Sequence, residues 1–254
     1  SLTIVATNMY SGISKFLLLA IPFFVLSGNI MAKAGISRRL IDFVDTCVGH
    51  KKGGIAIVCV IVSCFFGAIS GSGPATVAAL GAVLIPAMVE QGGFSAPFST
   101  ALMATSSSVA IVIPPSIAFV VYASITGVSI ADMFMAGIIP GILMGLALVV
   151  VVMLEVRRNH VVPSNVEKAS AKERWNAFKD AFWGFLMPII ILGGIYGGFF
   201  TPTEAAAVSV VYGLFVGMVI YKEVKFKDLW EILIDSAKTT GGIMLIVACA
   251  SLFS

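Results

Sequence analysis

The residues best suited to chemistry lie in polar breaks inside long apolar runs. The first break is Ser70-Gly71-Ser72-Gly73, followed by Pro74-Ala75-Thr76. Carbonyl and hydroxyl oxygens of unwound backbone suit Na⁺, whereas free N–H groups at the start of the next half-helix suit an anion. Glycine permits close backbone approach, and proline in a first helical turn removes no intrahelical hydrogen bond. We therefore predict a sodium site at 70–73 and a substrate site at 74–76.

A second break, in the next apolar run, has the same character. Ser106-Ser107-Ser108 precede Pro114-Pro115. We predict that the serines complete the sodium site and that the two prolines belong to the substrate site. The alternative is that these small residues only permit tight helix packing. Packing explains the GxxxG spacings well, which are Gly67/Gly71, Gly137/Gly141/Gly145, Gly193/Gly197 and Gly213/Gly217.

Enzymatic chemistry finds little support in the remaining residues. An intramembrane serine protease needs a membrane-embedded histidine beside its serine, but His50 and His160 lie in polar stretches. The sequence has no Walker A motif, so nucleotide hydrolysis is not indicated. The four cysteines form no CxxC pair and read as free thiols. We expect no organic cofactor and no nucleic-acid partner.

The elements that position these breaks are predicted to span a membrane. The chain is 59% hydrophobic and 11% charged, far below the roughly 25% charge of soluble domains. A helix needs about 20 apolar residues to cross the hydrocarbon core. Seven runs contain no Asp, Glu, Lys or Arg, namely 16–32, 53–89, 91–131, 133–154, 181–203, 205–221 and 239–254. The sequence predicts an all-α polytopic membrane protein.

Three basic stretches, 33–52, 155–180 and 222–238, fix the expected orientation. The positive-inside rule places all three in the cytoplasm. The first and third have helical apolar spacing and read as interfacial amphipathic helices. Runs 181–203 and 205–221 form two crossings, joined by a turn in which Thr201 and Glu204 have the capping-box pattern. The number of crossings between residues 52 and 155 must then be even.

Run 53–89 is broken near its centre into halves of about 15 residues, which are short for full spans. We predict a re-entrant hairpin over 53–91, with His50 and Gln91 on the same side. Residues 95–126 then form one broken helix that crosses once, interrupted at Thr105–Ser108 and at Pro114-Pro115. Two tightly spaced crossings of 53–89 are the alternative. We also expect Asn29 to be a buried hydrogen-bonding residue.

Several motifs, in order along nearly the whole chain, resemble the large membrane subunit of TRAP (tripartite ATP-independent periplasmic) transporters of the sialic acid or C4-dicarboxylate type. The resemblance rests on residues 20–24 (AIPFF), 67–79 (GAISGSGPATVAA), 84–88 (LIPAM), 104–108 (ATSSS), 113–117 (IPPSI), 121–123 (VYA) and 201–207 (TPTEAAA). It implies a Na⁺-coupled importer of organic acids in the bacterial inner membrane. Its expected partners are a small four-helix membrane subunit and a periplasmic substrate-binding protein. Another Na⁺- or H⁺-coupled carboxylate transporter, an ion channel, and a non-transporting scaffold subunit are the alternatives.

The resemblance also implies an elevator-type fold with two inverted repeats, each containing a re-entrant hairpin and a broken helix. Residues 1–52 would be a scaffold helix and arm, and 53–131 the first repeat of the transport domain. Residues 132–238 would be scaffold with a cytoplasmic loop at 155–180 and an arm at 222–238. Residues 239–254 would begin the second repeat. Because the sequence lacks an initial Met and its last run stops at Ser254, we expect a partial chain.

Overall fold

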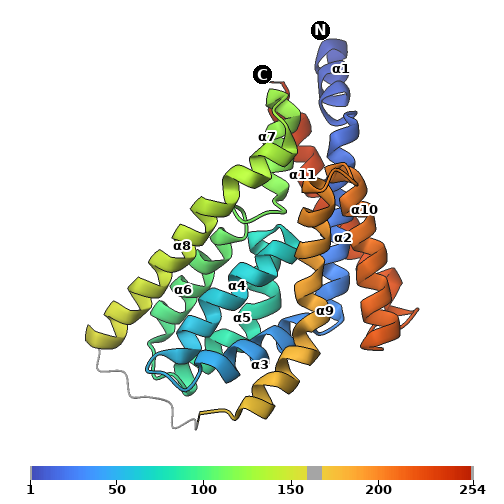
Figure 1. Cartoon of the computed structure of the whole chain (residues 1–254). Helices are drawn as coiled ribbons and strands as arrows, with labels where there is room; N and C mark the ends of the chain where they lie inside the picture. Colours follow the sequence, from blue (N-terminus) through green and yellow to red (C-terminus); the bar gives the residue numbers. More distant parts are fainter. Residues whose placement is uncertain (1, 159–167, 253–254) are drawn as a thin grey trace.

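A computed structural model describes residues 2–158 and 168–252; His160 lies outside this part. Among the described residues, the regular structure is helical and contains no strand (Figure 1). The elements are α1 (Leu2–Ile13), η1 (Phe16–Leu19), α2 (Ala20–Lys33), α3 (Ile36–Val48), α4 (Gly54–Ser70), α5 (Gly73–Glu90), α6 (Ala96–Val109), α7 (Ile117–Thr126), α8 (Ile130–Arg158), α9 (Ala171–Tyr196), α10 (Pro202–Phe215), the π-helical η2 (Val216–Ile220) and α11 (Asp228–Ala250).

Within the part of the chain that the structure describes, six segments are long and apolar enough to cross a membrane. They are Phe16–Lys33, Gly73–Glu90, Ile130–Arg158, Ala171–Tyr196, Pro202–Ile220 and Asp228–Ala250. Many of the large apolar side chains on these helices are exposed, as on a surface that faces lipid. The prediction of an all-α polytopic membrane protein is confirmed.

Helices α4 and α5 form an antiparallel pair whose outer ends lie together. A Cβ added to Gly53 would stand 3.6 Å from the Phe94 ring, and one added to Gly92 would stand 2.6 Å from Ile55. The two helices have 17 and 18 residues, longer than the predicted 15, because only Gly71 and Ser72 separate them. Since α5 is long enough to span a membrane, and two full crossings would also bring these ends together, the re-entrant hairpin stays a prediction.

The broken helix is present, but one of its two predicted interruptions is wrong. Residues 105–108 are helical and belong to the last turns of α6, and the break covers only 110–116, with a cis peptide bond between Pro114 and Pro115. The hydroxyl of Ser107 donates to Ala104 O at 2.7 Å. Such back-bonding lets a serine stay within a helix, so a serine run alone does not end one.

Helix α10 packs against α2, α9 and η1, and α2 also packs against α11. The amphipathic α3 lies across α4 and α9 and buries Ile36, Leu40 and Val44. Helix α8, which we assigned to the scaffold, packs against α4, α6 and α7 (Figure 1). Its glycines permit this approach, because Gly137 and Gly141 lie directly against the break at 112–113. The packing interpretation of this GxxxG series is thus supported.

Two local predictions in the second half of the chain have different outcomes. The capping box at the start of α10 is confirmed: Glu204 N–H donates to Thr201 Oγ1 (3.3 Å) and Thr201 N–H to Glu204 Oε2 (2.8 Å). The boundary predicted between 238 and 239, in contrast, falls inside α11, which is one continuous helix of 23 residues.

Candidate transport site

The tip of the α4–α5 hairpin is closed by hydrogen bonds among its own residues. Gly71 ends α4 in the left-handed conformation (φ +62°). Ser72 caps α5, with its hydroxyl accepting from Ala75 N–H at 3.4 Å and its carbonyl accepting from Thr76 N–H at 3.1 Å. The Thr76 hydroxyl donates to the same carbonyl at 2.9 Å and lies 3.3 Å from Ser70 Oγ. The serine, glycine and threonine types thus build one compact turn.

The tip meets the break of the other interrupted helix. Ile117 N–H, at the start of α7, donates to Gly71 O at 3.3 Å. A Cβ added to Gly71 would stand 2.8 Å from Pro115 O, and one added to Gly73 would stand 3.1 Å from Ser107 O. The two breaks, about 40 residues apart in the sequence, therefore touch through backbone, as the glycines permit.

The three predicted serines lie in different surroundings. Ser107 presents its carbonyl to Gly73. Ser106 is fully buried, and its hydroxyl lies next to the Cys59 thiol of α4. Since Met103 and Ala110 on the same side of α6 contact Cys59 and Gly67, Ser106 faces α4 below the tip. Ser108 is exposed, and its hydroxyl donates to Ala104 O at 3.3 Å.

The predicted substrate residues also divide by exposure. Pro74 is exposed and Ala75 half-buried, so both can reach a ligand. Thr76 is completely buried, and its N–H and hydroxyl are already bonded within the tip. Pro114 and Pro115 are buried beneath the break. Their position favours shaping the break over direct contact with a ligand.

Two cavities flank the tip and share Ser72, Pro74 and Ile243 as lining residues. The first, of about 460 Å³, lies towards α7 and is lined mainly by apolar side chains, among them Ile117, Val121, Tyr122, Ile246 and Val247. The second, of about 390 Å³, lies towards α2 and α11 and includes the polar residues Asn29, Ser70, Asp235 and Thr239. The tip therefore has an apolar and a polar neighbourhood.

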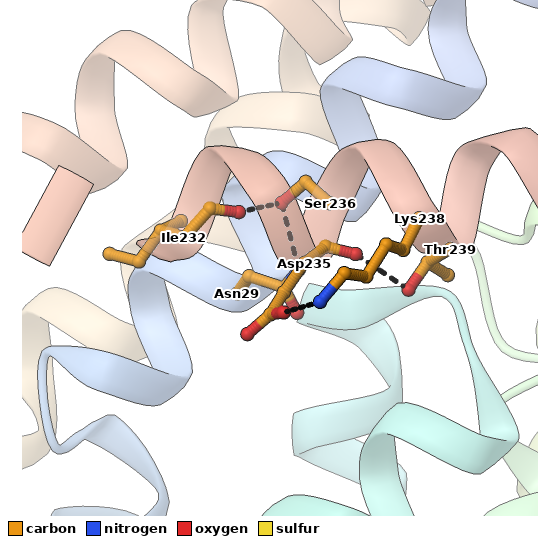
Figure 2. A network of polar contacts seen from close by, with 6 residues as sticks. All are labelled: Asn29, Ile232, Asp235, Ser236, Lys238 and Thr239. Carbon is orange, nitrogen blue, oxygen red and sulfur yellow. Dashed lines mark hydrogen bonds and ion pairs between the residues drawn. The ribbon is translucent and has the colours of Figure 1, made fainter. Parts of the chain in front are cut away.

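Sequence reasoning missed the contribution of α11, because it assigned residues 222–238 to a separate arm. Figure 2 shows the polar network along this helix, close to the hairpin. Asn29 Nδ2 donates to Ser236 Oγ at 2.8 Å, which confirms the expected hydrogen-bonding role of Asn29. Lys238 Nζ lies 3.5 Å from Asp235 Oδ1. An unbroken helical pattern from 228 to 250, without glycine or proline before Gly241, was the available signal.

A polytopic membrane fold with two interrupted helices that meet at backbone level defines the class of secondary transporters. The chain belongs to the DctM family, the DctM component of tripartite ATP-independent periplasmic transporters, whose family model matches residues 1–254. It is therefore a multi-pass protein of the bacterial inner membrane and part of a transport protein family, not an enzyme. The family expected from the sequence motifs is confirmed.

Three relatives that match nearly the whole of this chain are named as large permease proteins of TRAP transporters. The C4-dicarboxylate TRAP transporter large permease protein DctM of Pseudomonas aeruginosa is 44% identical over 249 residues, which are 98% of this chain and 58% of that protein. The protein of the same name from Rhodobacter capsulatus is 39% identical, covering 98% of this chain and 59% of its own length. The 2,3-diketo-L-gulonate TRAP transporter large permease protein YiaN of Escherichia coli is 41% identical, with 97% and 57% covered. The chain thus spans less than two thirds of these relatives.

Proposed function

We propose that this chain is the larger part of the permease subunit of a Na⁺-coupled importer of C4-dicarboxylates or related organic acids. The observation that most supports the proposal is the backbone contact between the hairpin tip and the helix break, through Gly71 and Ile117. Interrupted helices offer carbonyl oxygens to a cation and N–H groups to an anion at one place. The relatives named above transport acids of this class, according to their names.

In this proposal, oxygen atoms of the tip are the ligands of Na⁺. We assign the ion to the carbonyl and hydroxyl oxygens of residues 70–73, with the Ser107 carbonyl across the tip–break contact. Ser106 faces α4 below the tip, next to Cys59, so we leave its hydroxyl out of this ligand set. We exclude Ser108 from the set because it is exposed.

The organic acid binds, in this proposal, between the two cavities, against Ser72, Pro74 and Ala75. Residues 53–131 contain no Lys or Arg, and an ionised side chain at bilayer depth costs about 2.5–3.5 kcal/mol. Dipoles at the start of α5 and the bound Na⁺ would therefore stabilise the carboxylate. The coupling of ion and substrate follows, because each reduces the electrostatic cost of the other.

Transport itself would proceed by an elevator-type movement of the hairpin and broken helix against α2, α9 and α10. Packing of α8 on α4, α6 and α7 supports including α8 in the moving part. A periplasmic binding protein would deliver the acid, and a small four-helix membrane subunit would complete the permease.

The variant Gly73→Val tests the ion site. The added side chain would press on Ser107 O and Ile111, so we expect loss of Na⁺-dependent uptake with normal membrane insertion. The assay is uptake of radiolabelled C4-dicarboxylate into proteoliposomes that contain the full-length permease, its small subunit and the loaded binding protein. Gly193→Val is the matched control, since nothing lies within 4 Å of a Cβ there. Unchanged Na⁺ dependence in Gly73→Val would remove the tip from the ion site.

A further inference from the structure

The polar cavity on the α2–α11 side of the hairpin tip has features that the tip–break contact does not explain. It brings together the carboxylate of Asp235, the hydroxyl of Thr239, the amide of Asn29 and the tip serines 70 and 72. All of these side chains can offer an oxygen atom as a metal ligand, and the Asp235 carboxylate carries a negative charge. This composition suits a hard monovalent cation better than a transition metal. No group of three or more His, Cys, Asp or Glu residues that could hold a metal occurs within 2–158 and 168–252.

A hydrogen bond fixes the rotation of α11 in front of the tip. Ser236 is buried, donates its hydroxyl to Ile232 O at 2.7 Å and accepts from Asn29 at 2.8 Å (Figure 2). Adjacent residues of a helix point about 100° apart. When Ser236 faces α2, Asp235 is consequently turned to the cavity beside the tip, and Thr239 lies one turn further on the same face.

The oxygen atoms in this cavity still have coordination capacity. The Thr239 hydroxyl donates its proton to Asp235 O at 2.9 Å, which leaves the hydroxyl lone pairs available. Asn29 uses its amide nitrogen in the bond to Ser236, and its amide oxygen accepts no hydrogen bond from the described residues. The Asp235 carboxylate has Lys238 as its ion-pair partner, at 3.5 Å.

The ion pair between Asp235 and Lys238 is weak, so it does not prevent the Asp235 carboxylate from binding another cation. Both side chains are more than half exposed (59% for Asp235 and 74% for Lys238). An exposed pair at i,i+3 is worth only a few tenths of a kcal/mol. Lys238 can therefore be displaced from Asp235 by an ion that is better coordinated.

We propose that Asp235, with Thr239, Asn29 and the tip serines, forms a second Na⁺ site, in which the Lys238 ammonium and Na⁺ compete for the same carboxylate. The inference rests on the proposed Na⁺ coupling and extends it to α11, on the side of the tip opposite to the break. Because Ser70 and Ser72 belong to both sites, the tip connects them.

The competition gives two charge-removing variants opposite effects. Asp235→Asn removes the anionic ligand and should raise the half-saturating Na⁺ concentration by at least about tenfold, the factor that corresponds to 1.4 kcal/mol. Lys238→Gln removes the competing ammonium and should lower that concentration. Glu231→Gln is the matched control: it neutralises another carboxylate of α11 that pairs with a lysine (Lys33, 3.2 Å) but does not line the cavity.

The experiment is a Na⁺ titration of thermal unfolding of the purified full-length permease, with choline replacing Na⁺ at constant ionic strength, supported by ²²Na⁺ binding. Thr239→Ala removes one hydroxyl ligand at an exposed position and should also raise the half-saturating Na⁺ concentration. This second variant keeps the test decisive if Asp235→Asn does not fold. Wild-type Na⁺ affinity in both of these variants, or weaker binding in Lys238→Gln, would overturn the inference. Because the readout is binding, a permease that binds Na⁺ at Asp235 without taking up acid would refute only the proposed function.

Discussion

At the residue scale, the tip–break contact depends most on Gly71. Its positive φ and its approach to Pro115 O both require the absence of a side chain. Gly71→Ala should therefore abolish Na⁺-dependent uptake. Gly93→Ala is a close control, since Gly93 has a similar φ (+66°) with nothing within 4 Å. Both variants pay about 1–2 kcal/mol of backbone strain, so equal uptake in the two would contradict a functional contact at Gly71.

Thr76 provides a second residue-scale prediction. Its buried hydroxyl bonds to Ser72 O and lies beside Ser70 Oγ. Thr76→Val keeps the volume but removes these bonds, so the free energy of unfolding should fall by about 1–3 kcal/mol. Thr76→Ser keeps the hydroxyl and should retain most of the wild-type free energy of unfolding. Thermal unfolding in detergent measures both variants, and a Thr76→Val protein as stable as wild type would exclude this supporting role.

The sequence predicted where the polar residues gather but not the role of each. Residue types and the Gly-Pro spacing were enough to place the tip at 70–76. They could not show that Thr76 and the Ala75 N–H bond within the tip, or that Ser106 faces α4 and Ser108 faces outward, because these facts depend on helix rotation and on partners distant in the sequence.

At the element scale, the approach of α8 to the helix break depends on the absence of a side chain at Gly141. A Cβ there would collide with Ile113. Gly141→Val should push α8 away from the break and lower the melting temperature, since overpacking typically costs about 1–3 kcal/mol. Gly193→Val on α9 has open space and should be close to neutral. Comparable melting temperatures for the two variants would contradict the packing described for α8.

Elements with strong local signals were predicted well, among them the amphipathic α3 and the capping box of α10. The continuity of α11 was missed because its charged first half resembles an interfacial arm. The helix break was placed partly at 105–108 because serines and threonines can remain within a helix when their hydroxyls bond to preceding carbonyls, and the residue types do not show this.

At the scale of the whole molecule, aromatic side chains join the hairpin to the helices that the proposal treats as scaffold. Phe65 of α4 packs edge-on against Phe185 of α9, with ring centroids 5.0 Å apart, and Phe185 contacts Phe43 of α3 at 5.5 Å. An elevator movement would have to slide this contact. The hydrophobic part of this contact is not directional, so it can persist as the rings move past one another, whereas the edge-on geometry would be lost.

The central claim is that α4 and α5 enter and leave the membrane on one side, while α6 and α7 cross it once. Single cysteines test it most directly, in full-length protein with the native cysteines replaced and an impermeant thiol reagent applied to sealed vesicles. Lys51→Cys, Gln91→Cys and Ser129→Cys are suitable, because all three positions are exposed. We expect the first two to react only from the cytoplasmic side and the third only from the opposite side. Labelling of positions 51 and 91 from opposite sides would contradict the hairpin and the site built on it.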